Sequence, residues 1–129
     1  MKIDIDYNPK GYNKIQGYSA GKIIIAGRDY TSSLILMRSS LISDWPPERH
    51  TDMRSEHFSL FLELKPEVLL IGTGRKLEFL NQEITLPLQR ASIGCEVMDT
   101  GAACRTYNYL VDEGRDVAAA LLMIEPSVI

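Results

Sequence analysis

The chain has 129 residues, of which 45% are apolar and 24% charged, with 14 lysines and arginines against 17 aspartates and glutamates. This composition is ordinary for a globular protein, and the length suits a single domain, residues 1–129, with a substantial core. It excludes a disordered chain, which needs low apolar content and high net charge, and two cysteines are too few for a disulfide scaffold.

Charge and hydropathy exclude further classes. The basic residues are scattered and the net charge is -3, whereas nucleic-acid binders gather cations on one face, so no nucleic-acid partner is expected. The longest apolar run, residues 117–124, is far shorter than the roughly 20 residues of a membrane-spanning helix. Residues 1–6 contain no apolar signal-peptide core. We therefore expect a soluble, cytoplasmic protein without a transmembrane segment.

The first third of the chain has the pattern of antiparallel strands. Residues 14–18 and 22–26 flank Ser19-Ala20-Gly21, a short glycine-containing connection of the hairpin type. Gly27-Arg28-Asp29 is typical of a second turn, and residues 33–37 form another short apolar run. We expect two or three antiparallel strands before residue 45.

A helix is predicted after the strand region. Trp45-Pro46-Pro47 interrupts the strand pattern, because consecutive prolines continue neither a ladder nor a helix. Over residues 55–64 the apolar spacing becomes helical and places Phe58, Phe61 and Leu62 on one face, which the stem of Lys65 can extend, with Ser55 as a candidate N-cap.

The second half alternates strands and helices. Residues 68–71 form a continuous apolar run, as expected of a strand buried on both faces. Residues 77–80 suggest a short strand, and Asn81 then suits the cap of a helix that ends near Ser92. Pro87 is expected to kink or restart this helix.

The clearest predicted helix covers residues 100–113. It follows a strand candidate at residues 95–98, Thr100 suits its N-cap, and Gly114 suits the left-handed position beyond its end. One stripe of this helix is apolar and comprises Ala103, Tyr107, Leu110 and Val111. The run 117–124 is compatible with helix or strand, and we interpret it as a central strand.

These elements predict the α/β fold class. The expected architecture is a single three-layer domain with a mixed central β-sheet, flanking helices and an N-terminal antiparallel β-hairpin region.

Two turns that follow strands are candidate ligand-binding elements. Gly72-Thr73-Gly74 exposes backbone N–H groups and lets a ligand approach closely, because two of its positions lack a Cβ. It is not a dinucleotide fingerprint, since Leu77 stands where the third glycine would fall. The alternative is a tight turn without a binding role. Met98 to Ala103 forms the second strand-to-helix turn.

The two turns predict a ligand site if their strands are parallel. Both would then emerge at the edge of the sheet where open α/β proteins bind ligands, beside a helix N-terminus with free N–H donors. The hypothesis is a small polar or anionic ligand, with Gly72, Thr73, Gly74, Met98, Thr100, Ala103, Thr106 and Asn108 as candidate contacts. Asp99 opposes an anion, so the charge of the ligand stays open. Thr106 and Asn108 have a structural alternative as buried hydrogen-bonding groups.

No catalytic or metal-binding constellation stands out. Cys104 lies in the first turn of a predicted helix beside Arg105, which favours a thiolate, although a packed cysteine is the commoner outcome. Cys95 is expected in the core. His50 and His57 match no zinc spacing with the cysteines, and no G-x-S-x-G elbow is present. We expect no cofactor, metal or catalytic residue, and these observations favour a protein that is not an enzyme.

Two stretches of the chain resemble the signatures of a known family. The first is residues 66–74, and the second comprises residues 96–100, 102–108 and 113–115. Over nearly its whole length the chain is similar to a domain-of-unknown-function family, the Mth-type domain proteins. This family includes the mitochondrial complex I assembly factor three and the adipogenesis-associated Mth-type domain protein. The resemblance implies a three-layer α/β fold with a mixed central sheet and additional β structure beside it, and no established catalytic residue.

Two functions from different classes follow. The leading hypothesis is a bacterial, non-enzymatic protein-interaction or assembly-factor-like module with a protein partner, at the cytoplasmic face of the inner membrane. Asp4 and Asp6 argue against a mitochondrial presequence, which avoids acidic residues. The alternative is a small-molecule-binding protein or enzyme that uses a crevice between the Gly72–Gly74 turn and the N-terminus of the Thr100 helix.

Overall fold

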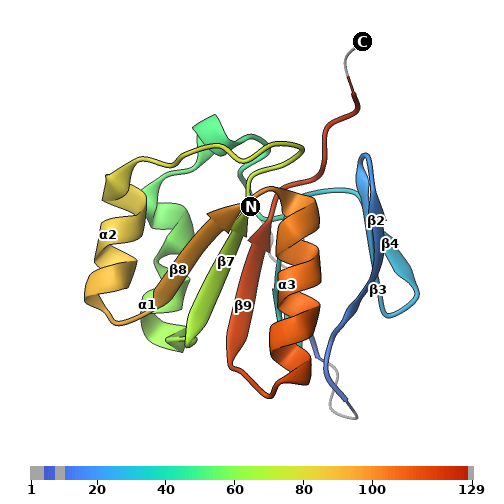
Figure 1. Ribbon diagram of the computed structural model, residues 1–129, viewed down its shortest axis with the longest axis horizontal. Helices are drawn as coiled ribbons and strands as arrows, with labels where there is room; N and C mark the ends of the chain where they lie inside the picture. The colour runs from blue at the N-terminus through green and yellow to red at the C-terminus, as the bar shows by residue number, and fades with distance from the viewer. Residues whose placement is uncertain (1–4, 8–10, 128–129) are drawn as a thin grey trace.

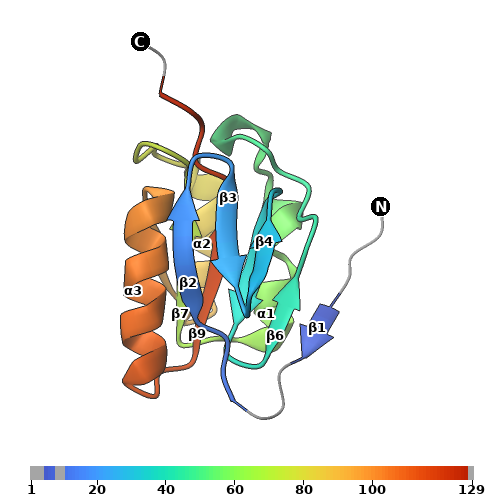
Figure 2. The same cartoon turned by 90° about the vertical axis from the view of Figure 1, so that its right-hand side faces the viewer.

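The computed structural model describes residues 5–7 and 11–127. Residues 1–4, part of the segment in which we found no signal-peptide core, lie outside the described residues. The chain folds into three layers (Figure 1, Figure 2). A central sheet carries α1 and α2 on one face, and α3 with a second, three-stranded sheet on the other. This is the α/β fold class predicted from the sequence.

The central sheet is mixed. Its strands, in spatial order, are β1 (Ile5–Tyr7), β6 (Ser40–Ile42), β5 (Leu34–Met37), β9 (Val117–Leu121), β7 (Val68–Gly72) and β8 (Gly94–Met98). β7 pairs in parallel with both β8 and β9, whereas β5 pairs antiparallel with β9 and β6, and β6 pairs antiparallel with β1. The run that was compatible with helix or strand is therefore a central strand, although it ends at Leu121 and not at Ile124. All five residues of β9 are buried because both of its faces are covered.

The second sheet consists of β2 (Ile15–Ser19), β3 (Lys22–Ile25) and β4 (Arg28–Tyr30). The predicted hairpin joins β2 to β3. The predicted second turn is too long, because only Ala26 and Gly27 form it, both with positive φ, while Arg28 and Asp29 already pair with β3. A two-residue turn of this type suits the twist of an antiparallel pair. With β5 and β6 as well, our expected two or three strands before residue 45 were too few.

The first predicted helix is divided. A 3-10 helix η2 (Ser55–Phe58) precedes the short α1 (Leu60–Leu64), and another 3-10 helix η1 (His50–Asp52) lies before them. Ser55 is the first residue of η2 and not its cap, so that prediction was wrong. Phe58 and Phe61 are buried, but Leu62, which we placed on the same face, is 38% exposed, because the divided helix turns it away from the core. Lys65 ends α1 in the left-handed conformation, immediately before Pro66.

The remaining helices are α2 (Gln82–Arg90) and α3 (Thr100–Asp112). Asn81 caps α2 as predicted, since its side chain accepts the Glu83 N–H, and the helix continues through Pro87 to Arg90. Asp99, and not Thr100, caps α3 by accepting the Ala102 N–H at 2.9 Å. Gly114 has the predicted left-handed conformation, with a φ of 78°. Residues 77–80 form no strand.

Candidate functional site

The two predicted turns meet at the carboxyl edge of the parallel strands. β7 and β8 are neighbours, and the Thr73 N–H donates to the Met98 carbonyl at 2.9 Å. The chain leaves β7 towards α2 on one face of the sheet and leaves β8 towards α3 on the other (Figure 1). Such a switch point is where open α/β sheets form a ligand crevice. The structure therefore brings Gly72, Thr73, Gly74 and Thr100 together as predicted.

The turns contact each other directly. The Gly74 N–H donates to Thr100 Oγ1 at 2.8 Å, and the Thr100 N–H donates to the Gly74 carbonyl at 2.8 Å. Thr100 is fully buried, and its hydroxyl donates to the Leu122 carbonyl at 2.9 Å. The Gly74 and Thr100 N–H groups, two of the donors that we expected for a ligand, are thus engaged within the protein. Ligand binding between the two turns stays a prediction.

Gly72 and Thr73 have roles in shaping this edge. A Cβ at residue 72 would lie 2.9 Å from Thr100 Oγ1 and 3.0 Å from Thr100 Cα, so the absence of a side chain lets α3 approach β7. The Thr73 hydroxyl donates to the Lys76 carbonyl at 2.6 Å and accepts the Glu78 N–H at 3.1 Å. Thr73 therefore folds the loop that follows β7.

The other candidate contacts, Met98 at the end of β8 and three residues of α3, lie at the core or farther along the helix. Ala103 is buried in the core between α3 and the sheet, and Met98 packs against that core. Thr106 is half-buried. Asn108 lies eight residues after Thr100, which corresponds to about 12 Å along the helix axis. The structure does not bring Asn108 to the carboxyl edge.

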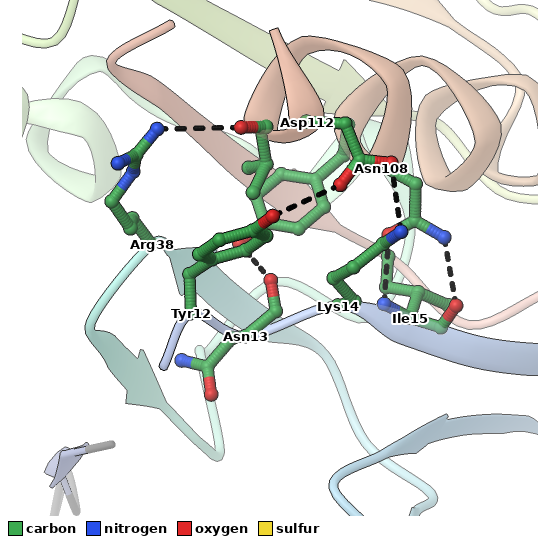
Figure 3. A network of polar contacts seen from close by, with 9 residues as sticks. Tyr12, Asn13, Lys14, Ile15, Arg38, Asn108 and Asp112 are labelled. Atoms are coloured by element: carbon green, nitrogen blue, oxygen red, sulfur yellow. Dashed lines mark hydrogen bonds and ion pairs between the residues drawn. The ribbon is translucent and has the colours of Figure 1, made fainter. Parts of the chain in front are cut away.

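Asn108 binds the start of β2 (Figure 3). Its Oδ1 accepts the Ile15 N–H and its Nδ2 donates to the Ile15 carbonyl, both at 2.8 Å. The Tyr107 hydroxyl donates to the Asn13 carbonyl at 2.8 Å, and the Lys14 ammonium lies 2.8 Å from the Asp112 carboxylate. This polar network joins the three-stranded sheet to α3. It supports the structural interpretation of Asn108.

Neither cysteine has the properties of a nucleophile. Burial raises the pKa of the Cys104 thiol to about 12, and the nearby positive charge of Arg105 offsets only part of this effect. Burial raises the pKa of Cys95 to about 11. Both side chains are therefore protonated thiols at neutral pH, and Cys104 packs in the core.

An open groove lies on the other side of the Gly72–Gly74 turn. Its volume is about 630 Å³, and three segments line it: Arg49, His50 and Thr51; Thr73, Arg75, Lys76 and Glu78; and Glu125 and Pro126. Of these residues, sequence reasoning had selected only Thr73 as a candidate. The adjacent cations Arg75 and Lys76 were the available signal, because the other two segments are far away in the sequence.

Two carboxylates of the groove have partners within the protein. Glu78 Oε2 lies 3.6 Å from His50 Nε2. Glu125 Oε1 accepts the Arg75 N–H at 3.0 Å, and the carboxylate covers Gly74 so closely that a Cβ there would collide with it. Gly74 has a φ of 101°, which favours glycine. The Arg75 N–H, immediately after the Gly72–Gly74 turn, therefore binds a carboxylate, and that carboxylate belongs to the chain itself.

A second surface is apolar and lies between η2–α1 and α2. This shallow groove of about 300 Å³ is lined mainly by Phe58, Leu62, Ile84, Pro87 and Leu88. Phe79, on the loop between β7 and α2, is 89% exposed, and it lines a neighbouring groove that shares Ile84 with the first. Exposed apolar side chains on both sides of a groove are typical of a binding surface.

The described part of the chain contains no group of three or more histidine, cysteine or acidic side chains that could hold a metal ion. Among the same residues, no helix is both long and apolar enough to span a membrane.

Comparison with models of protein families places the chain in one family. Residues 15–122 match the family described as protein of unknown function (DUF498/DUF598). The chain belongs to this family. The family assignment agrees with the resemblance inferred from the two signatures.

Curated relatives in this family have diverse names. The chain is 36% identical over 110 residues to "NADH dehydrogenase [ubiquinone] 1 alpha subcomplex assembly factor 3" from Mus musculus. The aligned region covers 84% of this chain and 59% of that protein. The chain thus spans about three fifths of the length of this relative. It is also 32% identical over 108 residues to "13 kDa major membrane protein" from Francisella tularensis, across 81% of this chain and 86% of that protein.

Solved structures share the fold of this family member. A crystal structure of a Bordetella parapertussis protein has a TM-score of 0.83 at 35% identity and covers 90% of this chain and 99% of that one. A solution structure from Bordetella pertussis, described as a Mth938-like domain, has a TM-score of 0.77 at 29% identity and covers 99% and 96%. The three-layer α/β architecture is therefore common to these proteins.

Proposed function

We propose that this chain is a non-enzymatic protein-interaction module that binds a protein partner through its α1–α2 face. We define this face by four exposed side chains: Leu62 and Pro87 line the apolar groove, Phe79 lines the neighbouring groove, and Leu86 precedes Pro87 on the outer side of α2. Its proposed location is the cytoplasm, at the surface of the inner membrane.

The distribution of exposed apolar side chains carries the proposal. Among the described residues, the large exposed aliphatic and phenylalanine side chains all come from α1, α2 or the loop before α2, and comprise Leu62, Leu64, Leu77, Phe79 and Leu86. On the opposite layer the large exposed apolar residues are tyrosines, which carry a hydroxyl. Burial of a side chain such as Phe79 is worth about 1.5–3 kcal/mol, so its exposure favours association with a partner.

The groove also indicates the chemistry of the partner. Its length runs between two helical segments, which suits the apolar stripe of an amphipathic helix. Glu56 lines both neighbouring grooves and Glu83 lines the one beside Phe79, where Arg54 is the one arginine and His50 lies beside Glu78. Acidic side chains predominate at this rim. The fitting partner is therefore a helix with an apolar face flanked by lysine or arginine.

The names of the relatives support an interaction role. A protein named as an assembly factor acts by contacting other proteins, and this chain is 36% identical to such a protein over most of its own length. Because the chain spans only 59% of that relative, its role in the assembly of a respiratory complex is part of the proposal.

Site-specific photo-crosslinking in the source cells tests the proposal. A photoreactive phenylalanine analogue at position 79 or 86 is expected to yield the same crosslinked protein. The analogue at position 109 is the matched control, since Tyr109 on α3 is 64% exposed and lies on the other face of the sheet. Leu86→Asp should abolish the crosslink from position 79, whereas Tyr109→Asp should leave it. Equal yields from positions 79 and 109, or none from either 79 or 86, would contradict the α1–α2 face.

A further inference from the structure

We propose that the groove beside the Gly72–Gly74 turn binds a small, multiply charged anion, and that the chain's own Glu125 carboxylate competes with this ligand. The site uses the segment after β6, the loop after β7 and the segment after β9. It shares no defining residue with the α1–α2 face. The two proposals therefore stand or fall independently.

The shape and position of the groove suit a small molecule. A volume of about 630 Å³ lies within the usual range for ligand sites. The groove opens beside the carboxyl ends of parallel strands, the edge at which open α/β sheets bind ligands. The switch point itself is closed by Thr100, and the adjacent groove is an open space that Thr73 of the same turn lines.

The charges of the groove favour an anion. Arg49, Arg75 and Lys76 are exposed on its walls, and within the described chain none of the three forms an ion pair with a carboxylate. Among the residues that line the groove, Glu78 pairs with His50, and the one other carboxylate is that of Glu125; Asp52, which interacts with the charge of Arg49, lies outside the lining. This is a local excess of positive charge in a chain whose net charge is -3. Two arginines and a lysine suit a phosphoryl group or paired carboxylates.

The bound Glu125 carboxylate demonstrates that the turn accepts an anion. Oε1 accepts the Arg75 N–H at 3.0 Å above the Cβ-free surface of Gly74. Ile124 holds the segment in place, since its carbonyl accepts the Gly21 N–H at 2.8 Å. Glu125 itself is exposed, and its side chain is bound there through the Arg75 N–H. A rotation of that side chain is therefore sufficient to free the Arg75 N–H for an external anion.

Competition by Glu125 has a measurable consequence. A ligand that must displace an internal carboxylate binds with an apparent affinity reduced by the fraction of molecules in which the site is free. Glu125→Gln removes the competing charge and keeps the size of the side chain. This variant should bind the anion more tightly, whereas loss of the groove cations should weaken binding.

The test is a titration of the ¹⁵N-labelled chain, followed by NMR at constant ionic strength, with pyrophosphate and citrate in separate arms. We expect saturable shifts of the Gly74, Arg75 and Lys76 amide signals with at least one probe. The double variant Arg49→Gln/Lys76→Gln should weaken binding by about tenfold or more, because two charge-assisted contacts are lost. Glu125→Gln should strengthen binding by about threefold or more.

Arg90→Gln is the matched control, since Arg90 is an exposed cation at the end of α2 that does not line the groove. Arg90→Gln should leave the affinities for pyrophosphate and for citrate unchanged. Non-saturable shifts with both probes, or equal weakening by Arg90→Gln and the double variant, would overturn the site. Unchanged or weaker binding by Glu125→Gln would overturn the competition. Saturable shifts with pyrophosphate identify the ligand chemistry as phosphoryl, and saturable shifts with citrate identify it as carboxylate.

Discussion

Thr100 is the residue that closes the carboxyl edge of the sheet. Its hydroxyl accepts the Gly74 N–H and donates to the Leu122 carbonyl, so it joins the end of β7, the start of α3 and the segment after β9. Gly72 makes this possible by leaving space for Thr100. A residue that we selected for ligand contact therefore has an evident structural role.

Replacement of Thr100 by valine tests this role. Valine has nearly the same shape but leaves the Gly74 N–H and the Leu122 carbonyl without their buried partner. We expect the free energy of unfolding to fall by about 2–4 kcal/mol, since each buried unpaired polar group costs about 1–3 kcal/mol. Urea denaturation measures the change. Thr100→Ser keeps the hydroxyl, so its free energy of unfolding should fall much less. Equal losses of stability in the two variants would contradict the role of the hydrogen bonds.

The attachment of the three-stranded sheet depends on one side of α3. Asn108 bonds both backbone groups of Ile15 (Figure 3). The Tyr107 hydroxyl donates to the Asn13 carbonyl. Ile15, Ile23 and Ile25 bring the apolar face of this small sheet into the same core as Tyr107. The sheet is thus held by apolar burial, and its register against α3 is set by the amide of Asn108.

Asn108→Leu should loosen this attachment without unfolding the central sheet. The leucine side chain cannot bond the Ile15 N–H or carbonyl, and we expect a stability loss of about 1–3 kcal/mol. Hydrogen exchange should become faster at the Ile15 and Ile25 amides relative to the amides of β7, because local opening follows local contacts. Tyr109→Leu, at the exposed neighbouring position, is the control. Equal exchange rates in the two variants would contradict the proposed attachment.

Exposed ion pairs and caps set the pH dependence of the whole molecule. Hydrogen bonding to Lys14 lowers the pKa of Asp112 below its ordinary value of 3.8, and the Asp116 N–H, followed by Arg115, lowers that of Glu67 below 4.5. The N–H groups of Arg49 and Glu48 lower the pKa of Asp52. These groups release their protons more readily in the folded chain than in the unfolded chain.

Acid should therefore destabilise the protein. The contribution of the three carboxylates is complete above their unfolded pKa values and is lost as the pH falls through the lower folded values. Urea midpoints should be nearly constant between about pH 5 and 8 and should fall below about pH 4.5. In Lys14→Met, the pKa of Asp112 measured by NMR should rise towards 3.8. An unchanged Asp112 titration in that variant would contradict the assigned cause.

Local sequence was sufficient for much of the fold. Periodicity predicted β7, β8, β9 and α3, and local hydrogen bonding predicted the cap at Asn81 and the end at Gly114, because these features depend on neighbours within a few residues. The short strands β4 and β6 escaped prediction, since three residues carry little periodicity and their pairing partners supply the stability.

Local sequence could not predict which backbone donors of the candidate site are free to bind a ligand. Gly72-Thr73-Gly74 marked the correct edge of the sheet. The availability of the Gly74 N–H depends on Thr100, 26 residues farther along the chain, and that of the following Arg75 N–H depends on Glu125, 50 residues farther along. The third wall of the groove comes from Arg49 and its neighbours, which follow a different strand. Hydrogen bonds and charges act over a few ångströms in space, so only the folded chain decides which of these distant groups meet.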